Sequence, residues 1–459
     1  MPSYARRPTV SNHEDLREPC RQAVRMAQSL GAQDVEVFAQ ETRDITTDIE
    51  KHDLQTSSSR QETIIGVRAM LDRQVGFTCT NILEELEASV ANAVQLAKAS
   101  PRDDNNRLPG PVAFDPVPDL HDPRAERCSA SEVVGQAIRM IETAESMDRR
   151  LVLGSGEFSV HLQTRCIVTS QGIDLLERSS LFSCFALATA KDGERVSNMA
   201  FQFDASHSFD GIDVTRVARR ACQDALSSLG AERGQSFVGP VILSPEAVLD
   251  VVVSLLSFQL SAKNALRGAS RWGSLLGQQV ACGDFHVVDN GRLPGGVATQ
   301  SFDREGVPHR EVTLIEAGTM QGLMHNSYTA HAMSIQNTAH ASGGARSLPG
   351  ISPTNLTILP GSSSKDDLIA DIQNGLLVNR FSGSSNPISG DFSGVAKAAF
   401  HIQGGKIVRP VTGTLIAGNV FESLMSLSGI SSETERVFSA VLPYLRLENI
   451  SVTSEKDAV

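Results

Sequence analysis

The sequence of 459 residues has little of what marks secreted or membrane-spanning proteins. Its seven cysteines are odd in number and no two have CxxC spacing, so we expect reduced thiols in a cytoplasmic protein. The most apolar run, Val248–Phe258, is interrupted and too short for a bilayer, which takes about 20 residues. No apolar stretch accompanies Arg6 and Arg7, so we predict no secretory signal and no membrane association.

An excess of positive charge is also missing. The chain has 53 acidic and 41 basic residues, a formal net charge of −12 and a pI near 5.4. This balance argues against a nucleic-acid partner bound by bulk charge. A hydrophobic content of 41% with 20% charged residues is typical of a folded protein. At roughly 150 residues per domain, the length suggests about three domains.

Standard catalytic motifs are absent as well. The sequence has no GxSxG nucleophile elbow and no GxxxxGK[ST] phosphate loop. The glycine pair Gly154 and Gly156 lacks the third glycine of a dinucleotide-binding fingerprint. The one His-Glu dipeptide, His13-Glu14, has no second histidine where a zinc-binding helix needs it. We therefore assign no catalytic residue and no metal ligand from motifs.

Hydrophobic periodicity predicts an α+β fold with mostly antiparallel sheets. The order of helix, several strands and helix occurs twice, and a β-rich domain follows. Residues 101–123 hold six of the 19 prolines, which disfavour regular structure there. The predicted organisation is a flexible N-terminus (1–19), an N-terminal α+β unit (20–100), a proline-rich linker (101–128), a central α+β unit (129–235) and a β-rich C-terminal domain (236–459).

Local signals predict several turns and one helix start. Residues 71–74 connect two strand-like runs and read as a hairpin, as does the Asp-Gly turn at 191–193. Ser244 is a good N-cap and Pro245 suits the first helical position, so we predict a helix from there to about Leu260.

Three histidines lie close together in the sequence, His325, His331 and His340. Neutral imidazoles can bind zinc and leave a coordination position open for water. Their spacings of six and nine match neither one helix face nor one strand face, which argues against a metal site. The polar wall of a binding cleft and unrelated packing histidines remain as alternatives.

A loop-forming segment, residues 381–394, is dense in Gly, Ser, Asn and Pro. Such a segment can present backbone N–H groups to an anion or a peptide, or it can be a structural loop.

Six segments carry a family resemblance: Leu30–Phe38, Gly66–Asn81, Phe302–Pro308, Ser352–Leu356 with Pro360-Gly361 after it, Asn386–Ser393 and Val408–Asn419. On these segments the chain resembles the TldD/PmbA family of metallopeptidases, whose older name is modulator of DNA gyrase. The resemblance extends from about residue 20 to residue 425. Each segment alone is a weak signal, and their combination is specific.

The resemblance implies one of two kinds of subunit. TldD-type subunits carry an HExxxH helix and a distal cysteine, which bind a metal, whereas PmbA-type subunits, also called TldE, lack these ligands. The corresponding helix here, Glu246–Leu260, contains no histidine, and no cysteine follows Cys282. The resemblance therefore implies a PmbA/TldE-type subunit with no cofactor of its own. Zinc is expected in a TldD-type HExxxH partner, in a heterodimer or a higher assembly, and a homodimer is expected when the partner is absent.

The chain also departs from the PmbA-type pattern. The position of His331 is usually basic there, and the motif ending at Ser393 is usually followed by Arg and Gly, where this chain has Gly394 and Val395. The expected substrate is a peptide or a peptide-like molecule, natural-product precursors included. Its expected contacts are His325, His331, His340, Asp391, Phe392 and Ser393. The alternatives are a stand-alone zinc hydrolase that uses the three histidines and a non-enzymatic protein-interaction subunit.

Overall fold

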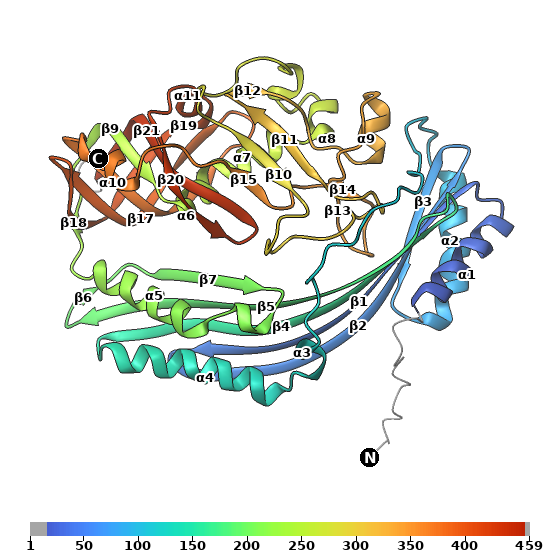
Figure 1. Ribbon diagram of the computed structural model, residues 1–459, viewed down its shortest axis with the longest axis horizontal. Helices are drawn as coiled ribbons and strands as arrows, with labels where there is room; N and C mark the ends of the chain where they lie inside the picture. Colours follow the sequence, from blue (N-terminus) through green and yellow to red (C-terminus); the bar gives the residue numbers. More distant parts are fainter. Residues whose placement is uncertain (1–15, 455–459) are drawn as a thin grey trace.

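The computed structural model describes residues 16–454 and consists of two parts that lie one above the other (Figure 1). The first part is a seven-stranded antiparallel sheet with the order β3-β2-β1-β4-β5-β6, in which β7 also pairs with β5. Its strands are β1 (Asp34–Glu50), β2 (Asp53–Leu71), β3 (Gln74–Thr80), β4 (Leu151–Thr169), β5 (Asp174–Asp192), β6 (Arg195–Val196) and β7 (Ala200–Ser206). Because β1 pairs with both β2 and β4, the two predicted α+β units share one continuous sheet.

Two pairs of helices cover this sheet at its two ends (Figure 1). The pair at one end is α1 (Arg17–Ser29) and α2 (Leu86–Ala99), which pack on β1 and β3. The pair at the other end is α4 (Ala130–Met147) and α5 (Val214–Ser227), which pack on β4 and β5. Each pair buries its own apolar cluster against the sheet. Short helical turns, η2 (Leu83–Glu85), α3 (Arg124–Arg127) and η3 (Phe209–Gly211), stand between these elements.

The second part is the β-rich C-terminal region that the sequence predicts. Its main sheet has twelve strands in the order β12-β11-β10-β15-β21-β9-β16-β17-β18-β8, with β19 on β17 and β21, and β20 on β21. The bounds are β8 (Glu232–Arg233), β9 (Phe237–Leu243), β10 (Val287–Asn290), β11 (Glu311–Glu316), β12 (Thr319–Met320), β15 (Leu356–Ile358), β16 (Asn374–Ser385), β17 (Asp391–Gln403), β18 (Lys406–Thr412), β19 (Thr414–Asn419), β20 (Gly429–Val437) and β21 (Ala440–Ser454). A separate ribbon pairs β13 (Ala341–Ser342) with β14 (Gly350–Ile351). The mixed α+β class predicted from the sequence is thereby confirmed.

A broken helix packs into the core of this part. It consists of α6 (Pro245–Val248), a π-helical turn η4 (Leu249–Val253) and α7 (Ser254–Gln259). The predicted cap is present, because the Ser244 side chain accepts a hydrogen bond from the backbone N–H of Ala247. The remaining helices are short: α8 (Ala262–Leu266), η5 (Trp272–Ser274), α9 (Ser327–Ala332), α10 (Lys365–Ala370) and α11 (Val420–Met425).

The proline-rich segment crosses between the two parts. It is irregular apart from one bridge at Arg102 and the single turn of α3, as its prolines predict. It is held to the C-terminal part, since the Ser301 hydroxyl accepts from the Val117 N–H and Arg292 donates to the Asp115 carbonyl.

Three further predictions concern the start of the chain, its cysteines and its helices. The first helix begins at Arg17, inside the segment predicted to be flexible, and His13-Glu14 lies outside the described residues. All seven cysteines are free thiols. Among residues 16–454, every helix is too short or too polar to cross a bilayer.

Candidate functional site

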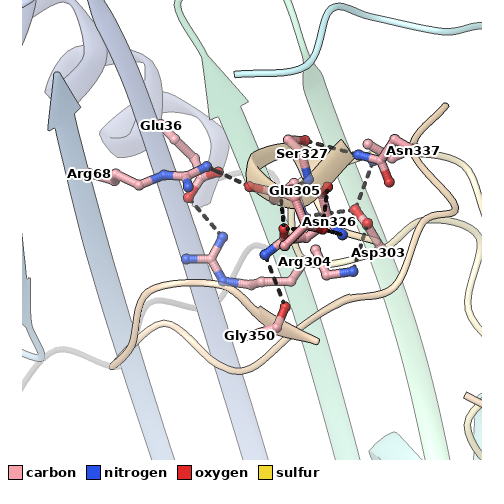
Figure 2. Close-up of polar contacts among 12 residues, drawn as sticks. Glu36, Arg68, Asp303, Arg304, Glu305, Asn326, Ser327, Asn337 and Gly350 are labelled. Carbon is pink, nitrogen blue, oxygen red and sulfur yellow. Dashed lines mark hydrogen bonds and ion pairs between the residues drawn. The ribbon is translucent and has the colours of Figure 1, made fainter. Parts of the chain in front are cut away.

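A buried network of charged side chains joins the two parts of the molecule (Figure 2). Glu36 on β1 and Arg68 on β2 face Arg304 and Glu305 of the Phe302–Pro308 segment. Arg68 donates to Glu36 and, at 3.1 Å, to Glu305, and Arg304 donates to Glu36 at 2.9 Å. All four side chains are less than a tenth exposed. Charges this deep persist only when each has a partner, so the network fixes how the two parts meet.

The neighbouring Asp303 organises the loop that carries Arg304 and Glu305. Its carboxylate accepts backbone N–H groups from Glu305 at 2.8 Å and from Val307 and Ala341 at 3.0 Å each. Burial and the nearby Glu305 carboxylate raise the pKa of Asp303 to about 8. Burial opposes the ionised form of Glu36 also, but Arg68 and Arg304 outweigh it and lower the pKa of Glu36.

A cleft opens between the two parts at the broken helix. It is about 350 Å³ in volume and adjoins a second hollow of about 290 Å³. The residues that line both are Phe201, Gln202, Arg220, Glu246, Arg380 and Glu435. They come from β7 and α5 of the first part and from α6, β16 and β20 of the second. We call these joined hollows the Glu246 cleft.

The carboxyl group of Glu246 in this cleft has a pKa near neutrality. Burial raises the pKa of its carboxyl from 4.5 to about 7, since Arg380 and Arg220 offset only part of the desolvation. Its Oε1 accepts a long hydrogen bond of 3.4 Å from the Gln202 amide, which also donates to Asp224 at 2.9 Å. A carboxyl that titrates near neutrality can accept, hold or release a proton from a bound molecule.

Asp250, the second carboxylate on this face of the broken helix, makes hydrogen bonds that stabilise the fold. The Asp250 Oδ2 accepts from the Arg380 Nε at 3.3 Å and from the backbone N–H of Phe381 at 3.1 Å. These bonds attach the first turns of the broken helix to β16.

Aromatic rings form the rim of the Glu246 cleft. Phe438, in the turn between β20 and β21, lies with its ring centroid 6.2 Å from Phe201 and 4.6 Å from Phe203 on β7. Phe438 is exposed, and its φ of 53° is unusual for a bulky residue. These rings therefore offer apolar surface to a ligand beside the charged side chains that line the cleft.

The three predicted histidines do not come together as one site. His325 and His340 are buried neighbours, with the backbone N–H of His340 donating to the His325 carbonyl at 3.1 Å. Burial and then His340 lower the pKa of His325 to about 4. The ring of His340 faces Asp289 at 3.3 Å, whereas His331 lies half-buried on α9. Within residues 16–454, no group of three or more His, Cys, Asp or Glu side chains could hold a metal.

The other predicted contacts begin strand β17. Asp391 is exposed and accepts from the Asn419 amide at 2.8 Å, and Ser393 is also exposed. Phe392 is buried with its ring edge toward Phe381, at a centroid distance of 5.9 Å. In the described part of the chain, these three share no hydrogen bond, ion pair or ring contact with the histidines.

Sequence reasoning did not single out Glu36, Arg68 or Glu246. One available signal was a charged residue between two apolar ones, since Glu36 lies between Val35 and Val37 in a strand-like run. Nothing local distinguishes Glu246, whose environment arises from segments distant in sequence.

Comparison with known proteins relates this geometry to a family. Three family models match the chain: PmbA/TldA metallopeptidase domain 1 at residues 35–97, the central domain at 125–229 and the C-terminal domain at 236–454. An uncharacterized protein of Methanocaldococcus jannaschii, MJ0231, is 26% identical over 395 residues, 85% of this chain and 89% of its own length. The metalloprotease PmbA homolog of Haemophilus influenzae is 24% identical over 434 residues, 93% of each chain. The crystal structure of TldE from Thermococcus kodakarensis has the same fold, with a TM-score of 0.86 at 23% identity, covering 95% of this chain and all of that one.

Proposed function

The chain belongs to the PmbA/TldA metallopeptidase family, and on that premise we propose that it is the metal-free subunit of a TldD/TldE-type heterodimeric peptidase. In this proposal a TldD-type partner supplies the zinc and the hydrolytic step. The present chain closes the substrate cleft and helps bind an extended peptide or peptide-like molecule. Its seven free thiols agree with a cytoplasmic setting.

The observation that carries the proposal is the chemistry of the broken helix. The family resemblance places a TldD-type HExxxH motif on this segment, but here the side chains that it turns into the Glu246 cleft include Glu246 and Asp250. Neither histidine nor cysteine is among the described residues that line the cleft. Zinc sites of metallopeptidases rely on such ligands. The donor set present does not fit zinc, so we derive no catalytic step through a metal on this chain.

The Glu246 cleft supports a role in holding an extended chain. Strand β7 lines it through Phe201, Gln202 and Phe203, and within residues 16–454 this strand pairs with β5 alone. An extended peptide can add to a free strand edge through backbone hydrogen bonds, with neighbouring hollows accepting its side chains. The rings of Phe201 and Phe438 suit apolar side chains, and the Glu246 carboxyl suits a polar or cationic one.

Co-expression tests this proposal. We expect the chain to co-purify with a TldD-type subunit and the pair to hydrolyse peptides, while neither chain does so alone. The matched variant is Phe438→Ala, at an exposed ring of the rim, which we expect to raise KM of the pair without loss of pairing. Hydrolysis by this chain alone, or failure to pair with any TldD-type subunit, would overturn the proposal.

A further inference from the structure

A second cleft lies beside the buried ion network and is lined by residues of β2, β3, α8 and α9. In Figure 1, α9 lies at the end of the C-terminal part that is near β3. It is about 500 Å³ in volume. Its polar lining residues are Arg68, Asn105, Asn106, Lys263, Arg267, Glu305, Asn326, Tyr328 and Thr329. The Glu246 cleft shares none of them and is lined by α5, α6 and β7 instead. We call the second hollow the Arg68 cleft.

Positive charge predominates in the Arg68 cleft. Three of its lining residues are cations, and Glu305 is the single carboxylate among them. Glu305 is already engaged, since Oε1 accepts from Arg68 at 3.1 Å and Oε2 from the backbone N–H of Ser327 at 2.8 Å. Lys263 and Arg267 on and after α8 are exposed and have no ion-pair partner in the described part of the chain. Two cationic groups thus remain available for a ligand.

Asp103, close to the lining residues Tyr328 and Asn105, is not itself part of the lining. It accepts the Tyr328 hydroxyl at 2.7 Å and the Asn105 amide at 2.9 Å, and it forms no ion pair with Lys263 or Arg267 in the described part of the chain. At the inner wall, Arg68 is buried and its Nε–H has no acceptor among residues 16–454. The charge of Arg68 is already balanced by its ion pairs with Glu36 and Glu305, so the cations of this hollow that are free to meet an anionic ligand are Lys263 and Arg267.

The rest of the lining is apolar and indicates a ligand with an apolar part. Val75, Leu266, Ala332, Leu348 and Pro349 surround the charged groups. Leu266 and Leu348 are exposed, 43% and 48% respectively, although both line the hollow. A ligand that joins an oxyanion to an apolar side chain would cover this surface and reach the cations together.

We propose that the Arg68 cleft binds the free carboxylate end of a peptide whose last side chain is apolar. The carboxylate would lie between Lys263 and Arg267, with the apolar side chain against Leu266 and Leu348. This rests on the proposed function, because it takes a peptide as the ligand. It adds a site for the C-terminus of a substrate or product that is separate from the Glu246 cleft.

Calorimetric titration of the full-length chain tests the proposal with three probes: N-acetyl-Ala-Leu, its C-terminal amide and inorganic phosphate. We expect the acid to bind about tenfold more tightly than the amide, because its carboxylate makes charge-assisted bonds that an amide cannot. We expect it to bind more tightly than phosphate, which has no apolar side chain to cover Leu266 and Leu348. The double variant K263Q/R267Q should lose about tenfold in affinity for the acid. These residues are exposed, so the variant should fold normally. Lys98→Gln, on the exposed face of α2, is the matched control and should bind like the parent.

Equal affinity for acid and amide, preference for phosphate, or unchanged binding by K263Q/R267Q would each overturn the proposal. The proposed function is measured separately, through pairing with a TldD-type subunit and hydrolysis by the pair. If the isolated chain prefers the acid but the pair is inactive, the subunit assignment fails and the carboxylate site stands. If the pair is active but the isolated chain shows no preference, only the carboxylate site is overturned.

Discussion

Among single residues, Glu36 takes part in joining the two parts of the molecule through a buried ion network. Its carboxylate accepts from Arg68 on the neighbouring strand and from Arg304 on a loop of the C-terminal part. Removing one member of a buried ion network is costly because the partners stay buried without compensation.

We therefore expect Glu36→Gln to lower the free energy of unfolding by about 3 kcal/mol, since buried Arg304 would lose its ion pair and buried Arg68 would keep Glu305 alone. Urea denaturation followed by circular dichroism measures this loss. The control is Asp72→Asn, which breaks the exposed ion pair with Arg102 and should cost less than about 1 kcal/mol. Equal losses in the two variants would show that the network is not what holds the parts together.

Glu246 gives a second prediction at this scale, a dependence of stability on pH. Because its pKa is raised from 4.5 to about 7, the folded protein holds a proton that the unfolded chain releases between these pH values. The stabilisation from this proton is complete below pH 4.5 and is lost as the pH rises through 7.

Glu246→Gln should remove this dependence. Relative to the parent, we expect the variant to gain roughly 2 kcal/mol in stability at pH 8 and much less at pH 4.5. Thermal unfolding across this range measures the difference, and exposed Glu84→Gln serves as the control. A difference that stays constant with pH would contradict the raised pKa.

Among elements, the ribbon of β16 and β17 is constrained by two glycines that face each other across the strands, Gly383 and Gly394. The ring of Phe381 covers the pair. A Cβ built on Gly394 would lie 2.5 Å from the Gly383 Cα and 2.8 Å from the Phe381 Cζ. Residues 381–394 were predicted to form a loop because they are rich in turn formers. They are mostly strand, and their turn lies near residues 386–390.

Gly394→Ala should consequently destabilise the protein by about 1–3 kcal/mol, as overpacking of a filled site does. The matched control is Gly110→Ala, where an added Cβ meets nothing within 4 Å and stability should be close to that of the parent. Melting temperatures of the two variants provide the comparison. A Gly394→Ala protein as stable as the control would mean that the strands can separate without cost.

Sequence reasoning recovered the elements whose signals are local. The cap at Ser244 and the hairpin after Leu71 follow from nearby residues. The stretch from Gln40 to Arg43 is polar but lies within the single strand β1. Pairing with both β2 and β4 keeps that stretch extended.

On the scale of the whole molecule, the two parts enclose features that no local pattern could predict. Arg68 and Glu305 are 237 positions apart, and Glu36 and Arg304 are 268 apart. The Glu246 cleft likewise combines β7 with the broken helix. The six predicted substrate contacts were chosen by loop position, and the structure distributes them between a buried histidine pair, α9 and the start of β17. Their role in binding stays a prediction.

The central claim is that this chain is the metal-free half of a zinc peptidase, and metal content tests it most directly. Elemental analysis would count zinc in the purified chain, in a TldD-type subunit and in their complex, alongside peptide hydrolysis by each. The account predicts no bound zinc and no hydrolysis for the chain alone, and about one zinc per pair with hydrolysis by the complex. Stoichiometric zinc together with turnover by the chain alone would contradict it.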